Sequence, residues 1–285
     1  MRGDISMVID FHTHIFPKGI RENREAYFAS EPAFKLLYSL PGSKLVGAQE
    51  IVAAMDRQGV DKSVIFGFPW KKSQTFIKHN DYILEAVARY PKRLIGLCCL
   101  DPFSRDAATE ALRCLEGGLA GIGELAFYQS GIDDEALEKL APLMQICRDK
   151  DLPVLIHTNE PVGHMYPGKT PHTLKQIYDL VKKFPENVIV LAHWGGGIFF
   201  FALLKKEVRE SLKNVYFDTA ASPFLYAPEI YRYAKDIVGL DKILFGSDFP
   251  LINPARYFKE LDMSGLSKAE IESICGLNAA QLFKL

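Results

Sequence analysis

Short runs of β-branched and other apolar residues recur along the chain, and each run ends at a turn residue or a polar residue. Runs of this length and composition are typical of buried strands. The eight predicted strands are residues 8–12, 63–68, 94–100, 121–126, 153–157, 188–193, 215–219 and 243–247.

The segments between these runs have apolar residues at helical spacing. Ile51 and Met55, for example, lie one turn apart before Gly59. Glycine or proline follows most of these segments, as is usual where a helix ends. The pattern therefore predicts an alternation of strand and helix throughout the chain.

The spacing of the predicted strands indicates the architecture. From residue 63 to residue 243, successive strands begin about 30 residues apart, the length that one strand, one helix and two connections need. Eight such units predict a (β/α)8 TIM barrel, an α/β fold, as a single domain over residues 1–285. An open doubly wound sheet is the alternative, but no G-x-G-x-x-G turn follows the first predicted strand.

The first strand-to-strand step is longer than the others by about 25 residues. The surplus, residues 17–47, is rich in charged and aromatic residues. We expect this insertion to fold near the barrel mouth, or else to close the side of the barrel.

Charge and composition exclude several classes of partner. The chain has 34 Lys and Arg against 35 Asp and Glu, a formal net charge of -1, so neither nucleic acid nor an anionic membrane is indicated. Its 5 cysteines form no C-x-x-C pair, and no apolar run is long enough to span a membrane. We expect a cytoplasmic protein with reduced thiols. The apolar run 198–204 is compatible with a homo-oligomer, and equally with a buried helix.

The first predicted strand ends in two histidines, His12 and His14. Side chains two residues apart on a strand share one face, so both imidazoles can bind the same metal ion. A single buried histidine is more often a hydrogen-bonded core residue, but a pair at this spacing favours metal. Asp10 is expected on the same face, deeper in the barrel, with a structural role.

Four other predicted strands also end in a group that can bind a metal. Glu124, His157, His193 and Asp248 end the fourth, fifth, sixth and eighth strands. Each alone has an ordinary explanation in an ion pair, a backbone hydrogen bond or a helix cap. Together they lie at the C-terminal rim, where barrel enzymes place their active sites. Nitrogen and oxygen donors without thiolates suit Zn, Mn, Fe or Co.

This ordered pattern resembles the amidohydrolase superfamily of metal-dependent barrels. The segments IDFHTHIFP, LAHWGGG and LFGSDFP are similar to its amidohydrolase 2 branch, which includes aminocarboxymuconate-semialdehyde decarboxylase-like proteins and mixes hydrolases with decarboxylases. The segment GIGELAFY, with its strand-four glutamate, instead resembles TatD-type hydrolases, where such a glutamate can bridge two metals.

The resemblance implies six metal-binding side chains, with His12, His14 and Asp248 around one ion and Glu124, His157 and His193 around a second if both sites are filled. One or two divalent ions per chain are expected, with Zn as the first candidate and Mn, Fe or Co as alternatives. The metal would lower the pKa of bound water toward about 7, and Asp248 would act as general base, with His157 and His193 as further catalytic groups.

The strand-four glutamate favours hydrolysis within this branch. The expected activity is that of a metal-dependent hydrolase, in which metal-activated water attacks a small carboxylate-bearing amide, lactone or ester. A nonoxidative metal-dependent decarboxylase, or carboxy-lyase, is one alternative, and a noncatalytic metal-binding barrel is another.

Residues beyond the predicted metal site are candidates for binding a small anionic substrate. A polar loop follows the fifth predicted strand and can bind an anion or simply face solvent. Tryptophans near the second and sixth strands can form apolar walls or belong to ordinary packing. The predicted substrate-binding residues are His164, Tyr166, Lys169, Trp70 and Trp194.

Overall fold

All eight predicted strand regions contain a strand in the computed structural model, which describes residues 5–285. Neighbouring strands pair in parallel and in chain order. The strands are β1 (Ile9–His14), β2 (Lys62–Phe66), β3 (Leu94–Gly96), β4 (Ile122–Leu125), β5 (Val154–Ile156), β6 (Ile189–Leu191), β7 (Val215–Asp218) and β8 (Ile243–Leu244).

Backbone hydrogen bonds close the strands into a barrel. Between β3 and β4, the amide of Cys98 donates to the carbonyl of Gly121 at 2.9 Å. Between β8 and β1, the amide of Phe11 donates to the carbonyl of Phe245 at 2.7 Å. Because both edges of the sheet are paired, no open edge remains there, and the predicted (β/α)8 TIM barrel is confirmed.

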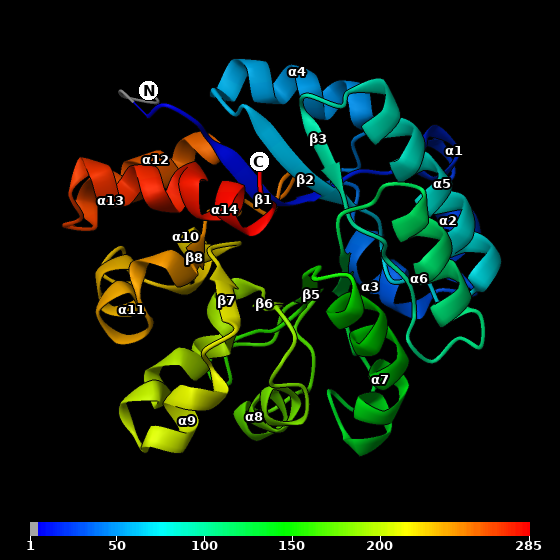
Figure 1. The fold of residues 1–285 in the computed structure, drawn as a ribbon. Coiled ribbons are helices and arrows are strands. Elements are labelled where there is room, and N and C mark those ends of the chain that lie inside the picture. Colours follow the sequence, from blue (N-terminus) through cyan, green and yellow to red (C-terminus); the bar gives the residue numbers. More distant parts are fainter. Residues whose placement is uncertain (1–4) are drawn as a thin grey trace.

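Helices surround the strands on the outside (Figure 1). No helix in residues 5–285 is long and apolar enough to cross a membrane. The longer helices are α4 (Ala48–Gln58), α5 (Ser73–Arg89), α6 (Ala107–Glu116), α7 (Asp134–Asp149), α8 (Leu174–Lys183), η1 (His193–Leu203), α11 (Ile230–Val238) and α12 (Pro254–Met263). The shorter ones are α1 (Lys18–Glu22), α2 (Glu25–Phe28), α3 (Pro32–Tyr38), α9 (Lys206–Ser211), α10 (Ser222–Leu225), η2 (Leu240–Lys242), α13 (Lys268–Glu272), η3 (Ser273–Leu277) and α14 (Asn278–Leu282).

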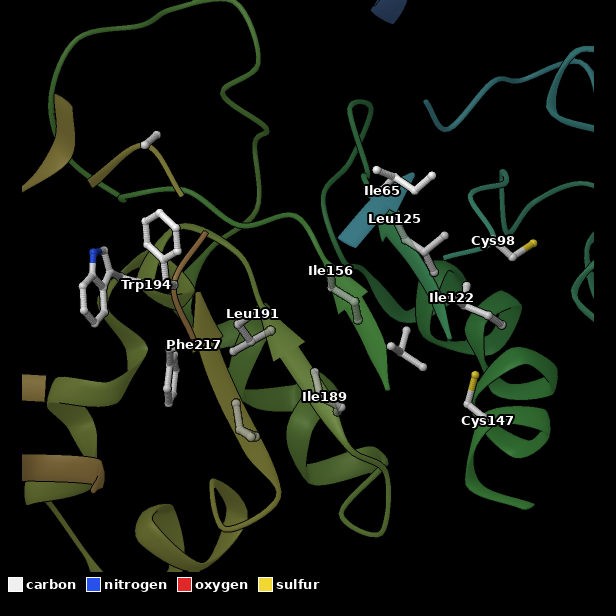
Figure 2. Close-up of a cluster of buried hydrophobic side chains, with 14 of the residues drawn as sticks. Ile65, Cys98, Ile122, Leu125, Cys147, Ile156, Ile189, Leu191, Trp194 and Phe217 are labelled. Carbon is white, nitrogen blue, oxygen red and sulfur yellow. The ribbon is translucent and has the colours of Figure 1, made fainter. Parts of the chain in front are cut away.

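The strands are apolar on both faces. Val64 and Val190 belong to a cluster inside the barrel, whereas Ile65, Leu191 and Phe217 belong to the larger cluster that includes the helices (Figure 2). Strands covered on both faces need nearly continuous apolar runs. This double burial explains why the strands could be located from the sequence.

A β-bulge in β1 determines where its histidines point. Phe11 faces the barrel interior, whereas Asp10 lines a small cavity with Ile51 of α4. The pairing of β1 with β2 shifts by one residue after Asp10, because β1 carries an extra residue there. The extra residue reverses the alternation, and His12 and His14 therefore face inward. The expectation that Asp10 shares their face is wrong.

Residues 17–47 contain α1, α2 and α3 and pack over residues that follow two of the strands. The ring of Tyr38 lies 6.1 Å from that of Phe68, shortly after β2. The side chain of Leu37 reaches to 4.0 Å from the position that a Cβ would take on Gly168, in the loop after β5. This segment thus brings side chains of α3 to the C-terminal side of the barrel.

Candidate metal centre

Side chains from four strands converge at the C-terminal side of the barrel interior. The Nε2 atom of His12 lies 3.6 Å from Oε2 of Glu124 and 3.7 Å from Oδ1 of Asp248. The Nε2 atom of His14 lies 3.7 Å and 3.5 Å from the same two oxygen atoms. The Nε2 atom of His193 lies 3.6 Å from Oε1 of Glu124. Three imidazoles and two carboxylates therefore share one centre.

Each of these three imidazoles is oriented through its other nitrogen. In every case Nδ1 lies within hydrogen-bond distance of an oxygen: Asp218 Oδ2 for His12 at 2.8 Å, the Gly67 carbonyl for His14 at 3.2 Å and the Ala220 carbonyl for His193 at 2.9 Å. A carbonyl or carboxylate accepts here, so Nδ1 carries the proton and donates it. In the neutral ring, the lone pair of Nε2 then points at the centre, the arrangement that a metal ligand requires.

The donor set fits a divalent metal ion. The Nε2 atom of His12 is buried and has no hydrogen-bond partner within residues 5–285, an arrangement that is costly unless a ligand uses the lone pair. In two triads that share His12, the donor atoms all lie within 4.8 Å of one another, one with Glu124 and His193 and the other with His14 and Asp248. Nitrogen and carboxylate donors without thiolates are typical of Mn, Fe, Co and Zn sites.

Charge at the centre also favours a cation. Burial alone would lower the pKa of His12, but the carboxylates of Asp218 and Glu124 outweigh it and raise that pKa well above its usual value. Burial likewise opposes ionisation of Glu124, yet the neighbouring His12 and His157 hold its pKa well below the usual range. Asp248 also has a lowered pKa, because a hydrogen bond from His14 and the nearby imidazoles outweigh burial. The carboxylates are therefore ionised.

His157 stands apart from the other site histidines. Its Nδ1 lies 2.9 Å from Oε1 of Glu124 and its Nε2 lies 3.0 Å from the carbonyl of Gly168. Both ring nitrogens are therefore engaged by oxygen atoms. In this arrangement His157 supports Glu124, and it does not present a free lone pair to the centre.

Asp218, at the end of β7, connects two of the site histidines. It is fully buried, and besides its contact with His12 it accepts hydrogen bonds from the backbone amides of His193 at 2.9 Å and Ala220 at 3.0 Å. Such a carboxylate fixes the orientation of the imidazole behind a metal site. Its place at the end of the seventh predicted strand was the only signal for it in the sequence.

The backbone is strained where two of the site residues leave their strands. His193 and Asp248 have φ values of 54° and 61°, in the left-handed region, which costs about 1 kcal/mol for a residue with a side chain. The amide of Asp248 donates to the carbonyl of His12 at 2.9 Å. This bond holds Asp248 beside β1, and the bond from the His193 amide to Asp218 holds His193 beside β7. Both side chains thereby enter the centre.

The glycines after His193 serve close packing. A Cβ on Gly196 would lie 2.4 Å from the carbonyl oxygen of Asn159, and the residue has a φ of +61°. Only glycine fits so near the backbone that follows β5.

The loop after β5 is held by a residue that sequence reasoning did not single out. Glu160 accepts hydrogen bonds from the Tyr166 hydroxyl at 2.8 Å and from the Lys169 ammonium at 2.7 Å. Burial, Glu160 and Asp248 all raise the pKa of Tyr166. His164 is exposed and contacts the ring of Tyr166. The positive charge of Lys169 is thus already paired.

The two tryptophans lie in the core. The indole of Trp70 is fully buried against Phe34 and donates to Nδ1 of His79 at 2.8 Å. Trp194 is fully buried in the larger apolar cluster that includes the helices (Figure 2). Its indole donates a hydrogen bond to the hydroxyl of Ser222 at 3.0 Å. Neither ring has surface left for a ligand, and the prediction that they line the substrate site is corrected.

Nearly the whole chain matches one known protein family. The amidohydrolase family model Amidohydro_2 matches residues 9–285. The chain belongs to this family. The resemblance to the amidohydrolase 2 branch is thereby confirmed, and the chain is an enzyme of that superfamily.

Named relatives match most of the chain. It is 24% identical to 2-amino-3-carboxymuconate-6-semialdehyde decarboxylase of Dictyostelium discoideum, over 98% of this chain and 92% of the relative. It is 23% identical to gamma-resorcylate decarboxylase of Polaromonas, over 85% of this chain and 89% of the relative. Its fold is similar to that of 5-carboxyvanillate decarboxylase of Novosphingobium aromaticivorans, solved with manganese and 4-hydroxy-3-methoxy-5-nitrobenzoic acid, with a TM-score of 0.79, 17% identity and coverage of 99% and 97%.

These names correct the expected activity. The relatives are named as decarboxylases, so the expectation of a hydrolase is wrong. It rested on Glu124, and a carboxylate at this position is compatible with either reaction because it contacts His12 and His157 whichever chemistry follows. Manganese in the similar structure also means that zinc is not established for this chain.

Proposed function

We propose that this protein is a metal-dependent nonoxidative decarboxylase acting on a small, anionic, conjugated carboxylate. The observation that carries the proposal is the convergence of three imidazole Nε2 atoms and two carboxylates on one buried centre. The names of the relatives support decarboxylation over water addition. We also propose that residues 1–285 work as one barrel domain whose segment 17–47 lies at the mouth.

We propose that His12, His14 and Asp248 hold the metal, with Glu124 beside them. These donors have oriented lone pairs or ionised oxygens facing the centre. When bound, a divalent ion supplies positive charge that binds the substrate oxygens and favours the electron-rich state of the reaction. Either manganese or zinc is compatible with these donors.

The reaction needs a proton at the carbon that loses its carboxylate. The bond between that carbon and the carboxylate breaks, its electron pair forms a new bond to a proton, and carbon dioxide leaves. We propose His193 as the proton donor. Although burial opposes its protonation, Glu124 and Asp248 raise its pKa. Its Nδ1 is fixed on the Ala220 carbonyl, so the proton on Nε2 faces the centre.

The decisive experiment measures carbon dioxide and metal together. Protein loaded with Mn²⁺ or Zn²⁺ is incubated with 2,6-dihydroxybenzoate, 5-carboxyvanillate and a panel of related conjugated carboxylates. We expect carbon dioxide in equal amount to the decarboxylated product, and at least about a 100-fold loss in Asp248→Asn. The matched control is Asp241→Asn, at an exposed aspartate on η2. Full metal occupancy without carbon dioxide from the whole panel would contradict the proposal.

Two histidine variants separate binding from proton transfer. We expect His12→Gln to lose both bound metal and turnover. His193→Gln should keep metal occupancy near that of the wild type while turnover falls by about 100-fold or more. Elemental analysis and product formation on the same samples give both readouts. Loss of metal from His193→Gln would instead make that residue a ligand.

A further inference from the structure

Three aromatic side chains from separate segments meet beside His157. The ring of Tyr128, shortly after β4, stacks on His157 with centroids 6.3 Å apart and on Phe68 at 6.4 Å. Phe68 in turn contacts the ring of Tyr38 on α3 at 6.1 Å. The cluster of Tyr38, Phe68 and Tyr128, called the aromatic cluster below, therefore links segment 17–47 to the metal centre.

The two hydroxyl groups of the aromatic cluster have no protein partner. Tyr38 and Tyr128 are half-buried, and within residues 5–285 no hydrogen bond joins either hydroxyl to another residue. A phenol hydroxyl that no residue engages is free to donate to a ligand. By contrast, the hydroxyl of Tyr166 and the ammonium of Lys169 are both held by Glu160.

Burial and the nearby carboxylates keep both hydroxyls protonated. Burial raises the pKa of Tyr38, and the charges of Asp248 and Glu124 raise it further. Burial also raises the pKa of Tyr128, and the charges of Glu124 and Asp248 raise it further. Neutral phenols are hydrogen-bond donors, and the oxygen of an anionic ligand is a suitable acceptor.

We propose that Tyr38 and Tyr128 determine specificity by donating hydrogen bonds to an oxygen substituent next to the scissile carboxylate of the substrate. The inference rests on the proposed decarboxylation, because it places the carboxylate at the metal and the neighbouring oxygen toward the aromatic cluster. Through Tyr38 on α3, segment 17–47 would then contact the substrate directly. A barrel without this segment would lack that contact.

The test compares two ligands that differ by one hydroxyl group. Binding of 2-hydroxybenzoate and of benzoate to the Mn²⁺-loaded enzyme is measured by calorimetry in the wild type, Tyr38→Phe and Tyr128→Phe. We expect the wild type to prefer 2-hydroxybenzoate by about 10-fold or more, and each Phe variant to lose about 10-fold in affinity for it. Affinity for benzoate should stay within about 2-fold, because phenylalanine keeps the ring contacts.

A matched control and a second readout keep the result interpretable. Tyr233→Phe, at an exposed tyrosine on α11, should bind both ligands as the wild type does. Phe variants that retain the full preference would overturn the inference, and carbon dioxide release by the wild type would show that the proposed function survives. If the loaded wild type bound neither ligand and released no carbon dioxide, both would fail together.

Discussion

At the scale of single residues, the orientation of His12 depends on Asp218. The carboxylate is fully buried, and its contact with Nδ1 directs the lone pair of Nε2 into the centre. Removing the charge leaves a hydrogen-bond group of the same size, so the fold should persist while the imidazole becomes a weaker and less fixed ligand.

We expect Asp218→Asn to lower metal affinity by about 10- to 100-fold. Competition with a chelator gives the affinity, and circular dichroism checks the fold. Asp101→Asn is the matched control, since Asp101 follows β3 and is only half-buried. Equal affinity in the wild type and Asp218→Asn would show that Asp218 does not orient His12.

At the scale of elements, a bulge in β4 brings Glu124 to the centre. Ile122 pairs with Val154 and Leu125 with Ile156, so β4 uses one residue more than β5 over this stretch. Gly123 lies within the bulge with a φ of +137°, and a Cβ there would be 2.5 Å from the carbonyl of Leu155. The bulge therefore needs glycine.

We expect Gly123→Ala to lower the free energy of unfolding by more than about 2 kcal/mol, from the backbone clash and the strained φ. Metal affinity should fall as well, because Glu124 is the next residue. Urea unfolding and metal titration measure the two effects. Gly42→Ala is the control, since nothing lies within 4 Å of its added Cβ. A similarly small effect at both positions would contradict this account of the bulge.

The bulges also limit what sequence can predict. Alternation along a strand places His12 and His14 on one face, as expected, but it put Asp10 there too, because an inserted residue leaves no mark in the local pattern. The burial of the two tryptophans could not be predicted for a related reason. Trp194 donates to Ser222 and Trp70 to His79, and the fold brings these partners together.

At the scale of the whole molecule, stability should depend on pH through two buried histidines. Burial lowers the pKa of His79 to about 4 and that of His172 to about 3, from 6.5. Both are neutral in the fold, whereas the unfolded chain takes up their protons below pH 6.5. The free energy of unfolding is therefore unaffected by these two groups above pH 6.5. It decreases as the pH falls from 6.5 toward about 3 to 4.

We expect His79 to add about 1.4 kcal/mol per pH unit to the slope of unfolding free energy between pH 6.5 and about 4. Urea unfolding of the metal-free protein over this range gives the slope, and the wild type is compared with His79→Gln because other groups titrate there too. The variant should have the shallower slope even though it loses the hydrogen bond to the Ile15 carbonyl. Parallel slopes would show that His79 is not kept neutral by the fold.

The sequence alone was enough to predict the barrel, the family and the strand ends that carry the candidate metal ligands. These features follow from local patterns, since strands buried on both faces need apolar runs and the residue after each run lies at the same rim. The tertiary structure decided which groups meet: it turned His157 toward Gly168, placed Asp218 behind His12 and packed Tyr38 against Phe68. These contacts join residues far apart in the chain, and their geometry depends on bulges and loop packing that no local pattern encodes.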